Sequence, residues 1–145
     1  TWNALDNRWP SSLPWIAEWS TAELLMAHAN PFGYGDWTYL SDEKSLEKAA
    51  EVCAMRGYRY GIFGHLHRHT QHSTPDCEIH VVGSIGQPRS RHDRAPHWAM
   101  VEVAKSEVSI VRHDVRFDAA AHCAAVRQHP DFTEDTKAKL CGYFE

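Results

Sequence analysis

The chain contains no long run of apolar residues, no excess of basic residues and no Cys-x-x-Cys pair. Without an apolar run long enough to cross a bilayer, we expect no membrane partner. The net charge of -4 offers no basic surface for nonspecific nucleic-acid binding. The four cysteines follow no metal or disulfide spacing, which indicates reduced thiols and a cytoplasmic protein.

The composition is that of a folded domain. Of the 145 residues, 43% are hydrophobic and 11% are aromatic, as is typical of globular proteins that bury most of their unfolded surface. No repeat, low-complexity tract or long linker divides the sequence, so residues 1–145 are predicted to form a single domain. Because the chain begins with Thr1, we expect it to have been processed or cut from a larger polypeptide.

The segment Gly64-His65-Leu66-His67 is the most informative part of the sequence. It follows the apolar run Tyr60–Phe63, which we predict to be a buried strand. If the chain stays extended, His65 and His67 point to one face with Cα atoms roughly 6.5 Å apart. Two such imidazoles can bind one metal ion, or a pair of ions about 3.5–4 Å apart.

Two further segments also run from a predicted strand into polar residues. The strand predicted over residues 23–28 ends at His28, directly before the turn signal Asn30-Pro31. The strand predicted over residues 77–82 leads into the glycine-rich loop Gly83-Ser84-Ile85-Gly86-Gln87-Pro88-Arg89.

The rest of the pattern predicts an α/β fold. We expect helices over residues 41–57, 117–128 and 133–140, a helical turn over residues 13–19, a loop over residues 67–76, and a hairpin of residues 97–103 and 108–112. His80 alternates out of phase with its apolar neighbours, so we interpret it as a surface residue of its strand.

Taken in order, strand–His, strand–Gly-His-x-His and strand–Gly-Ser-x-Gly-x-Pro-Arg resemble the C-terminal half of the calcineurin-like metallophosphoesterase superfamily, most closely its small bacterial and archaeal phosphodiesterases. The similarity runs from about residue 24 to residue 115. It implies part of a two-sheet β-sandwich flanked by helices. It also implies hydrolysis of a phosphodiester or phosphomonoester by water activated at two divalent transition metal ions (Mn, Fe, Ni, Co or Zn).

The resemblance assigns His28 and His65 as ligands of one ion and His67 as a ligand of the other. It places Gly83, Ser84 and Arg89 at the substrate. The earlier ligand blocks of this family are absent: the sequence contains no Asp-x-His and no Gly-Asn-His, and its Gly-Asp pair follows His28, too late for the second block. We therefore assign no catalytic residue and expect a C-terminal portion whose N-terminal half is missing.

Other interpretations remain open at this point. The chain could be a non-catalytic binding or scaffold module that keeps part of the fold. It could also hold a mononuclear site in which the three histidines are joined by Asp36 or Asp93. The aromatic residues Tyr34, Trp37 and Tyr39 could stack a base or sugar, or could pack on the domain.

The predicted half-sandwich implies a partner. Half of a two-sheet fold exposes a hydrophobic sheet edge and an uncovered sheet face, which proteins rarely tolerate. We therefore expect this chain to bind its missing half or to self-associate, in addition to binding a phosphoester substrate.

Overall fold

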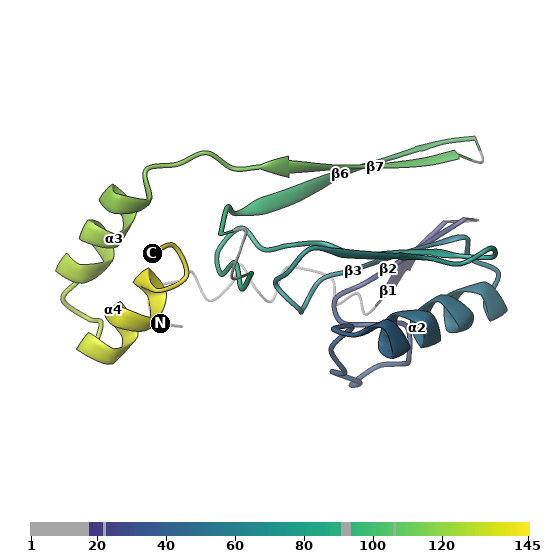
Figure 1. The fold of residues 1–145 in the computed structure, drawn as a ribbon, viewed down its shortest axis with the longest axis horizontal. Helices are drawn as coiled ribbons and strands as arrows, with labels where there is room; N and C mark the ends of the chain where they lie inside the picture. The colour runs from purple at the N-terminus through teal and green to yellow at the C-terminus, as the bar shows by residue number, and fades with distance from the viewer. Residues whose placement is uncertain (1–17, 22, 91–93, 106) are drawn as a thin grey trace, which may run out of the picture.

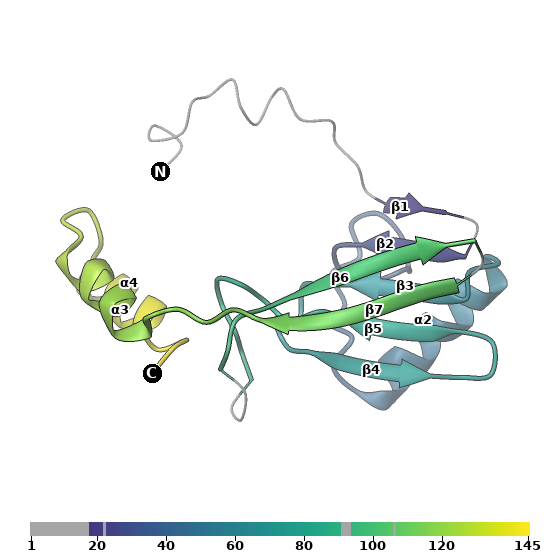
Figure 2. The same ribbon diagram turned by 90° about the horizontal axis from the view of Figure 1, so that it is seen from above.

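The computed structural model describes residues 18–21, 23–90, 94–105 and 107–145, which form layers of strands and helices (Figures 1 and 2). The elements are β1 (Glu18–Ser20), β2 (Leu24–Ala27), α2 (Glu43–Met55), β3 (Tyr60–Phe63), β4 (Thr70–Ser73), β5 (Glu78–Val81), β6 (His97–Ala104), β7 (Glu107–Asp114), α3 (Ala119–Gln128) and α4 (Glu134–Cys141). The predicted α/β class, with two sheets and flanking helices, is confirmed.

The larger sheet has five strands in the order β1-β2-β3-β5-β4. Strands β2, β3 and β5 run parallel, and the edge strands β1 and β4 run antiparallel to their neighbours. The three parallel strands carry the buried side chains of Leu24, Leu25, Phe63, Ile79 and Val81. Such continuous apolar character is typical of strands that are covered on both faces.

Helix α2 covers one face of this sheet (Figure 1). It begins with a reciprocal cap: the Asp42 carboxylate accepts a 2.8 Å hydrogen bond from the Ser45 N–H, and the Ser45 hydroxyl accepts one of 3.2 Å from the Asp42 N–H. Leu46, Ala49 and Cys53 recur at helical spacing and are buried against the sheet. The helix predicted over residues 41–57 is confirmed.

The hairpin of β6 and β7 forms the second sheet and lies over the other face (Figures 1 and 2). His97 begins this hairpin; it is buried, and its Nδ1 lies 3.0 Å from Oδ1 of Asp114. A Cβ placed on Gly83 would lie 2.7 Å from Cδ2 of His97, so glycine is required where the chain leaves β5 and meets the hairpin. The expectation of an uncovered face is wrong for the five-stranded sheet, because α2 and the hairpin lie on its two faces.

Helices α3 and α4 pack against each other at one end of the molecule, apart from α2 (Figures 1 and 2). Each contributes one buried cysteine, Cys123 and Cys141, to the contact between them. The Sγ of Cys141 lies 3.7 Å from the Cys123 carbonyl oxygen. In the described part of the chain, no helix has the length and apolar content needed to cross a bilayer.

Two strands lie where the sequence predicts none. Strand β4 falls within the predicted loop of residues 67–76; its residues are polar, and they become a strand through pairing with β5. Strand β1 begins at Glu18, inside the helical turn predicted over residues 13–19, whose residues 13–17 lie outside the described residues. Both are edge strands, which need less apolar character than central ones.

The prediction that His80 lies on the surface is wrong. Its exposed fraction is 7%, and its Nε2 lies 2.6 Å from Oε1 of Glu78. The hairpin covers this face of the sheet, and Trp98 of β6 and His80 line the same cavity of about 210 Å³ between the two sheets. Successive side chains of β5 therefore point alternately to two covered faces of the sheet, and not to one core face and one solvent face.

Candidate functional site

The three parallel strands end side by side at one edge of the sheet. Their register pairs Ala27 with Phe63 and Phe63 with Val81, so the residues that follow each strand emerge at the same level. Ligands of parallel α/β sheets bind beyond this carboxyl edge. His28, the Gly64–His67 segment and the glycine-rich loop all begin here, which brings the three sequence motifs together.

His28 and His65 lie next to each other at this edge. The Gly64 N–H donates a 2.8 Å hydrogen bond to the His28 carbonyl oxygen. A Cβ on Gly64 would lie 3.4 Å from that same oxygen, so a side chain at this position would crowd the two strands. The imidazole centroids of His28 and His65 are 5.3 Å apart, with the rings inclined at 65°.

Aromatic side chains enclose the His65 ring. Tyr39 stacks on it with centroids 4.4 Å apart and an interplanar angle of 8°, and Trp37 lies 5.4 Å away. Burial, followed by the neighbouring His28, lowers the pKa of His65, and a hydrogen bond to the Trp37 main chain partly opposes this. The neutral imidazole, which is the form that binds metals, is therefore favoured.

The backbone at the two histidines differs from the extended segment that the sequence predicts. Strand β3 ends at Phe63, and both His65 (φ 62°) and His67 (φ 59°) adopt the left-handed conformation. Side chains other than glycine disfavour this region by about 1–2 kcal/mol. The expectation that the two imidazoles share one face of a strand is therefore wrong, and such backbone strain is concentrated at functional sites.

His67 is bound to the glycine-rich loop rather than to the other two histidines. Its Nδ1 lies 3.0 Å from the Gln87 carbonyl oxygen, and the Arg89 N–H donates a 3.0 Å hydrogen bond to the His67 carbonyl oxygen. Because a carbonyl oxygen only accepts, neutral His67 carries its proton on Nδ1. That tautomer leaves Nε2 without a proton and so able to accept a hydrogen bond or bind a metal ion.

The loop residues placed at the substrate by the sequence have structural roles of their own. The Ser84 hydroxyl accepts a 3.0 Å hydrogen bond from the Gln87 N–H and so closes the turn. Gly83 makes room for His97, as described above. Arg89 is exposed, and its charge is one of the smaller contributions that lower the pKa of His65. Substrate binding by Gly83, Ser84 and Arg89 stays a prediction.

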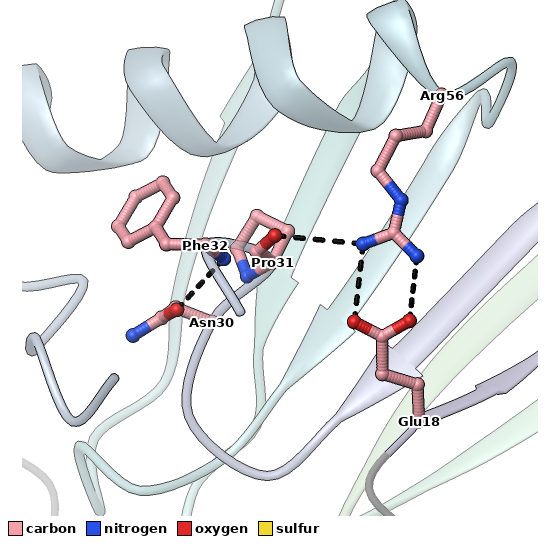
Figure 3. Close-up of polar contacts among 5 residues, drawn as sticks. All are labelled: Glu18, Asn30, Pro31, Phe32 and Arg56. Atoms are coloured by element: carbon pink, nitrogen blue, oxygen red, sulfur yellow. Dashed lines mark hydrogen bonds and ion pairs between the residues drawn. The ribbon is translucent and has the colours of Figure 1, made fainter. Parts of the chain in front are cut away.

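Asn30 organises the loop that follows His28. Its Nδ2 donates to Oδ1 of Asp36 (2.9 Å) and to the Thr38 carbonyl oxygen (3.0 Å), while its Oδ1 accepts from the Phe32 N–H (2.9 Å; Figure 3). Asn30 itself is 4% exposed. The loop is therefore held from inside by one amide side chain, which the Asn30-Pro31 turn signal did not reveal.

The described residues do not assemble a complete ligand set. Among them, no three His, Cys, Asp or Glu side chains are grouped closely enough to hold a metal ion. Asp36, a candidate fourth ligand, instead accepts hydrogen bonds from Thr38 and Asn30, which lower its pKa. Asp93, the other candidate, lies outside the described residues. The pair of His28 and His65 fits part of a metal site, and a full dinuclear set is not formed by this part of the chain.

Comparison with known proteins identifies the architecture. No family model and no curated protein matches the sequence. A metallophosphoesterase from Sphaerobacter thermophilus superposes with a TM-score of 0.67 at 18% identity, over 94% of this chain. The chain has the metallophosphoesterase fold. It spans 62% of the length of that neighbour.

A second solved structure of the metallophosphoesterase fold is more distant. A double mutant of Vps29 from Entamoeba histolytica gives a TM-score of 0.40 at 13% identity, over 68% of this chain and 59% of that one. At this level of similarity the match adds nothing to the site. The predicted resemblance is thus confirmed as a metallophosphoesterase fold, while the ligand roles of His28, His65 and His67 stay predictions.

Proposed function

We propose that this chain is part of a metal-dependent phosphoesterase and supplies histidine ligands to its metal centre. One observation carries the proposal: the parallel strands β2 and β3 end in register and bring His28 and His65 together, with ring centroids 5.3 Å apart. This edge is where sheets of this kind bind their ligands. The substrate is a phosphodiester or a phosphomonoester.

The donor set favours divalent transition metals. Imidazole nitrogens suit Mn, Fe, Ni, Co or Zn better than Mg, which prefers oxygen ligands. We propose two such ions, His28 and His65 contributing to one and His67 to the other. Metal ions held here would lower the pKa of bound water and neutralise phosphoryl oxygens.

The chain's own residues prepare this site in two ways. Burial lowers the pKa of His65 and so favours its neutral form, and Tyr39 stacks on the His65 ring. The Gln87 carbonyl oxygen sets the His67 tautomer that offers Nε2. Arg89 follows directly on this contact, and we propose that its guanidinium binds a phosphoryl oxygen.

We propose that the remaining ligands come from a partner segment, either the missing N-terminal half or a second copy of the chain. Two features support this part of the proposal. The neighbour from Sphaerobacter thermophilus is longer, since this chain spans 62% of it. In the described part of the chain, β6 and β7 pair only with each other, so both outer edges of this hairpin are available for further strands.

A non-catalytic scaffold is the second candidate function. The open edges of β6 and β7 and the incomplete grouping of ligands among the described residues favour it. In that case, the hairpin would recruit a partner by strand addition and the histidines would serve no reaction.

Metal titration separates the two functions. The chain, stripped of metal, is titrated with Mn²⁺ and Co²⁺ by calorimetry, and the Co²⁺ absorption spectrum reports the donors. We expect binding that weakens by more than about tenfold in His28→Ala and in His65→Ala. His129→Ala is the matched control, because His129 lies beyond α3 and stacks on Phe132.

Hydrolysis of bis(4-nitrophenyl) phosphate and 4-nitrophenyl phosphate is measured on the same samples. Turnover is expected only after a segment that carries the missing ligands is added. Robust turnover by this chain alone would contradict the incomplete site, and metal binding that ignores His28 and His65 would favour the scaffold.

A further inference from the structure

A loop of exposed aromatic residues borders the candidate metal centre. The exposed fractions are 80% for Tyr34, 61% for Trp37 and 45% for Tyr39. Loop aromatics that pack on their domain are buried to a larger extent, so Tyr34 and Trp37 are not held by core packing. The loop is nevertheless ordered from within by the hydrogen bonds that Asn30 makes with Asp36, Thr38 and Phe32, the last of which is drawn in Figure 3.

This loop and the end of β2 form a groove of about 770 Å³. Its lining includes Glu18, His28, Asn30, Tyr34, Asp36 and Trp37. The volume lies within the range of about 300–1,000 Å³ that is typical of small-molecule sites. His28 both lines the groove and belongs to the histidine pair of the candidate metal centre. A ligand bound in the groove would therefore lie next to that centre.

The rings are placed to receive a flat group. The Trp37 ring lies 6.1 Å from His28 and 5.4 Å from His65, edge-on or tilted to each. An exposed indole face that flanks the centre offers a stacking surface, and Tyr34 offers a second one on the same groove. Stacking of this kind accepts any planar aromatic group.

The charges of the groove restrict what can enter. Glu18 and Asp36 line it, and hydrogen bonds lower the pKa of each carboxyl, so both stay ionised near neutral pH. Arg56 neutralises Glu18 through two hydrogen bonds, whereas Asp36 receives its hydrogen bonds from neutral partners, Asn30 and Thr38. The Asp36 carboxylate would repel a second phosphate in the groove, whereas it would not repel a neutral or cationic ring.

We infer that the groove receives the aromatic group of a phosphoester, a nucleobase or an aryl ring, and that its phosphoryl group reaches His28 and His65. The inference rests on the proposed function and specifies its substrate class. Trp37 is the main stacking residue, because it borders both the groove and the histidine pair. Polyanionic substrates, in which the group beyond the ester carries further phosphates, are disfavoured.

Ring binding can be tested without metal and without phosphate. The metal-free chain is titrated with adenosine and with phenol, and binding is followed by saturation-transfer NMR of the ligand; ribose is the control ligand. We expect adenosine or phenol to bind and ribose not to bind. In Trp37→Ala the affinity falls by about tenfold or more, in keeping with the loss of one stacked ring, and Trp37→Phe retains part of it.

Trp98→Ala is the matched control variant. Trp98 is 40% exposed and lies on β6, where it stacks on His113 instead of bordering this groove. Tighter binding of adenosine assigns the site to nucleotide substrates, and tighter binding of phenol assigns it to aryl esters.

Two outcomes overturn the inference and are distinguishable from each other. If neither ring binds, or Trp37→Ala changes nothing, while Mn²⁺ still binds through His28 and His65, the groove assignment fails and the phosphoesterase proposal stands. If the rings bind through Trp37 but no metal binds at the histidines even after a segment that carries the missing ligands is added, the proposed function fails, and the groove is not a phosphoester site.

Discussion

Arg56, at the C-cap of α2, donates two hydrogen bonds to the carboxylate of Glu18 in edge strand β1 (Figure 3). Its Nη1 lies 3.1 Å from Oε1 of Glu18, and its Nη2 lies 2.5 Å from Oε2. One of these nitrogens also lies 3.5 Å from the Pro31 carbonyl oxygen. A single guanidinium thus joins the helix, the edge strand and the loop after His28. Bidentate pairing of this kind holds its partners in a defined geometry.

Replacing Glu18 by glutamine should lower the free energy of unfolding by about 1 kcal/mol or less at neutral pH, since the pair is partly exposed. The hydrogen bond with Arg56 lowers the pKa of Glu18 from its usual 4.5. The stabilisation is therefore present above pH 4.5 and is lost as the pH falls through the lowered pKa of the folded state. Urea unfolding at pH 7 and at a series of pH values below 4.5 measures this: the two proteins should differ at pH 7, and the difference should shrink as the pH falls. The exposed helical Glu51→Gln is the control, and a difference that does not depend on pH would argue against the pair.

The left-handed backbone at His65 predicts an unusual order of stability. His65→Gly should be more stable than His65→Ala by about 1 kcal/mol, because only alanine retains the strain of a positive φ. Thermal unfolding of both variants provides the measurement.

At His72, in the middle of strand β4, the order should reverse, because glycine weakens an extended strand. Equal stability of the two variants at position 65 would mean that the strain is relieved elsewhere. Both variants at position 65 should lose metal affinity alike, which separates ligand loss from instability.

Gly83→Ala should destabilise the protein by about 1–3 kcal/mol, the usual cost of overpacking. The new methyl group would lie 2.7 Å from Cδ2 of His97, a buried ring that is held by Asp114 and has little room to move. Gly86→Ala, in the same loop, meets no atom within 4 Å and should be close to neutral. Chemical denaturation of the two variants side by side checks the contact between β5 and the hairpin.

Asn30→Asp should disorder the loop of Tyr34 and Trp37. The substitution removes the amide that donates to Asp36 and Thr38 and places a second carboxylate beside Asp36. The new carboxylate at the buried position 30 would lack hydrogen-bond donors on one oxygen, and leaving one buried group without a partner costs about 1–3 kcal/mol. Amide hydrogen exchange of residues 31–39 should rise, and adenosine or phenol binding should weaken. Gln128→Glu, at the exposed end of α3, is the charge-matched control; unchanged exchange in Asn30→Asp would contradict the role of Asn30.

The four thiols should be protected in the folded protein. All are free and buried, and a hydrogen bond to Cys77 together with burial raises the pKa of the Cys53 thiol. Since the thiolate is the reactive form, a colorimetric disulfide reagent should react slowly with native protein and rapidly with all four thiols in guanidinium chloride. Fast reaction of Cys123 and Cys141 alone would indicate that the contact of α3 with α4 opens while the rest of the protein stays folded.

The sequence by itself determined the local structure and the grouping of the site. The Tyr60–Phe63 strand, helix α2 and the hairpin of β6 and β7 follow from apolar periodicity and capping residues, which act within one element. The three strand-to-loop motifs also predicted that His28 and the Gly64–His67 segment share one region. This held because parallel strands place their carboxyl ends at a common edge.

Only the tertiary structure decided where the side chains at that edge point. His65 and His67 have positive φ angles, so their imidazoles do not point to one face as they would in an extended strand. No periodicity in the sequence predicts these angles. Pairing with β5 made β4 a strand despite its polar residues, and the hairpin buried His80 on a face that alternation marks as exposed. Hydrogen-bond pairing and coverage by distant segments are long-range effects, so they override local preference wherever that preference is weak.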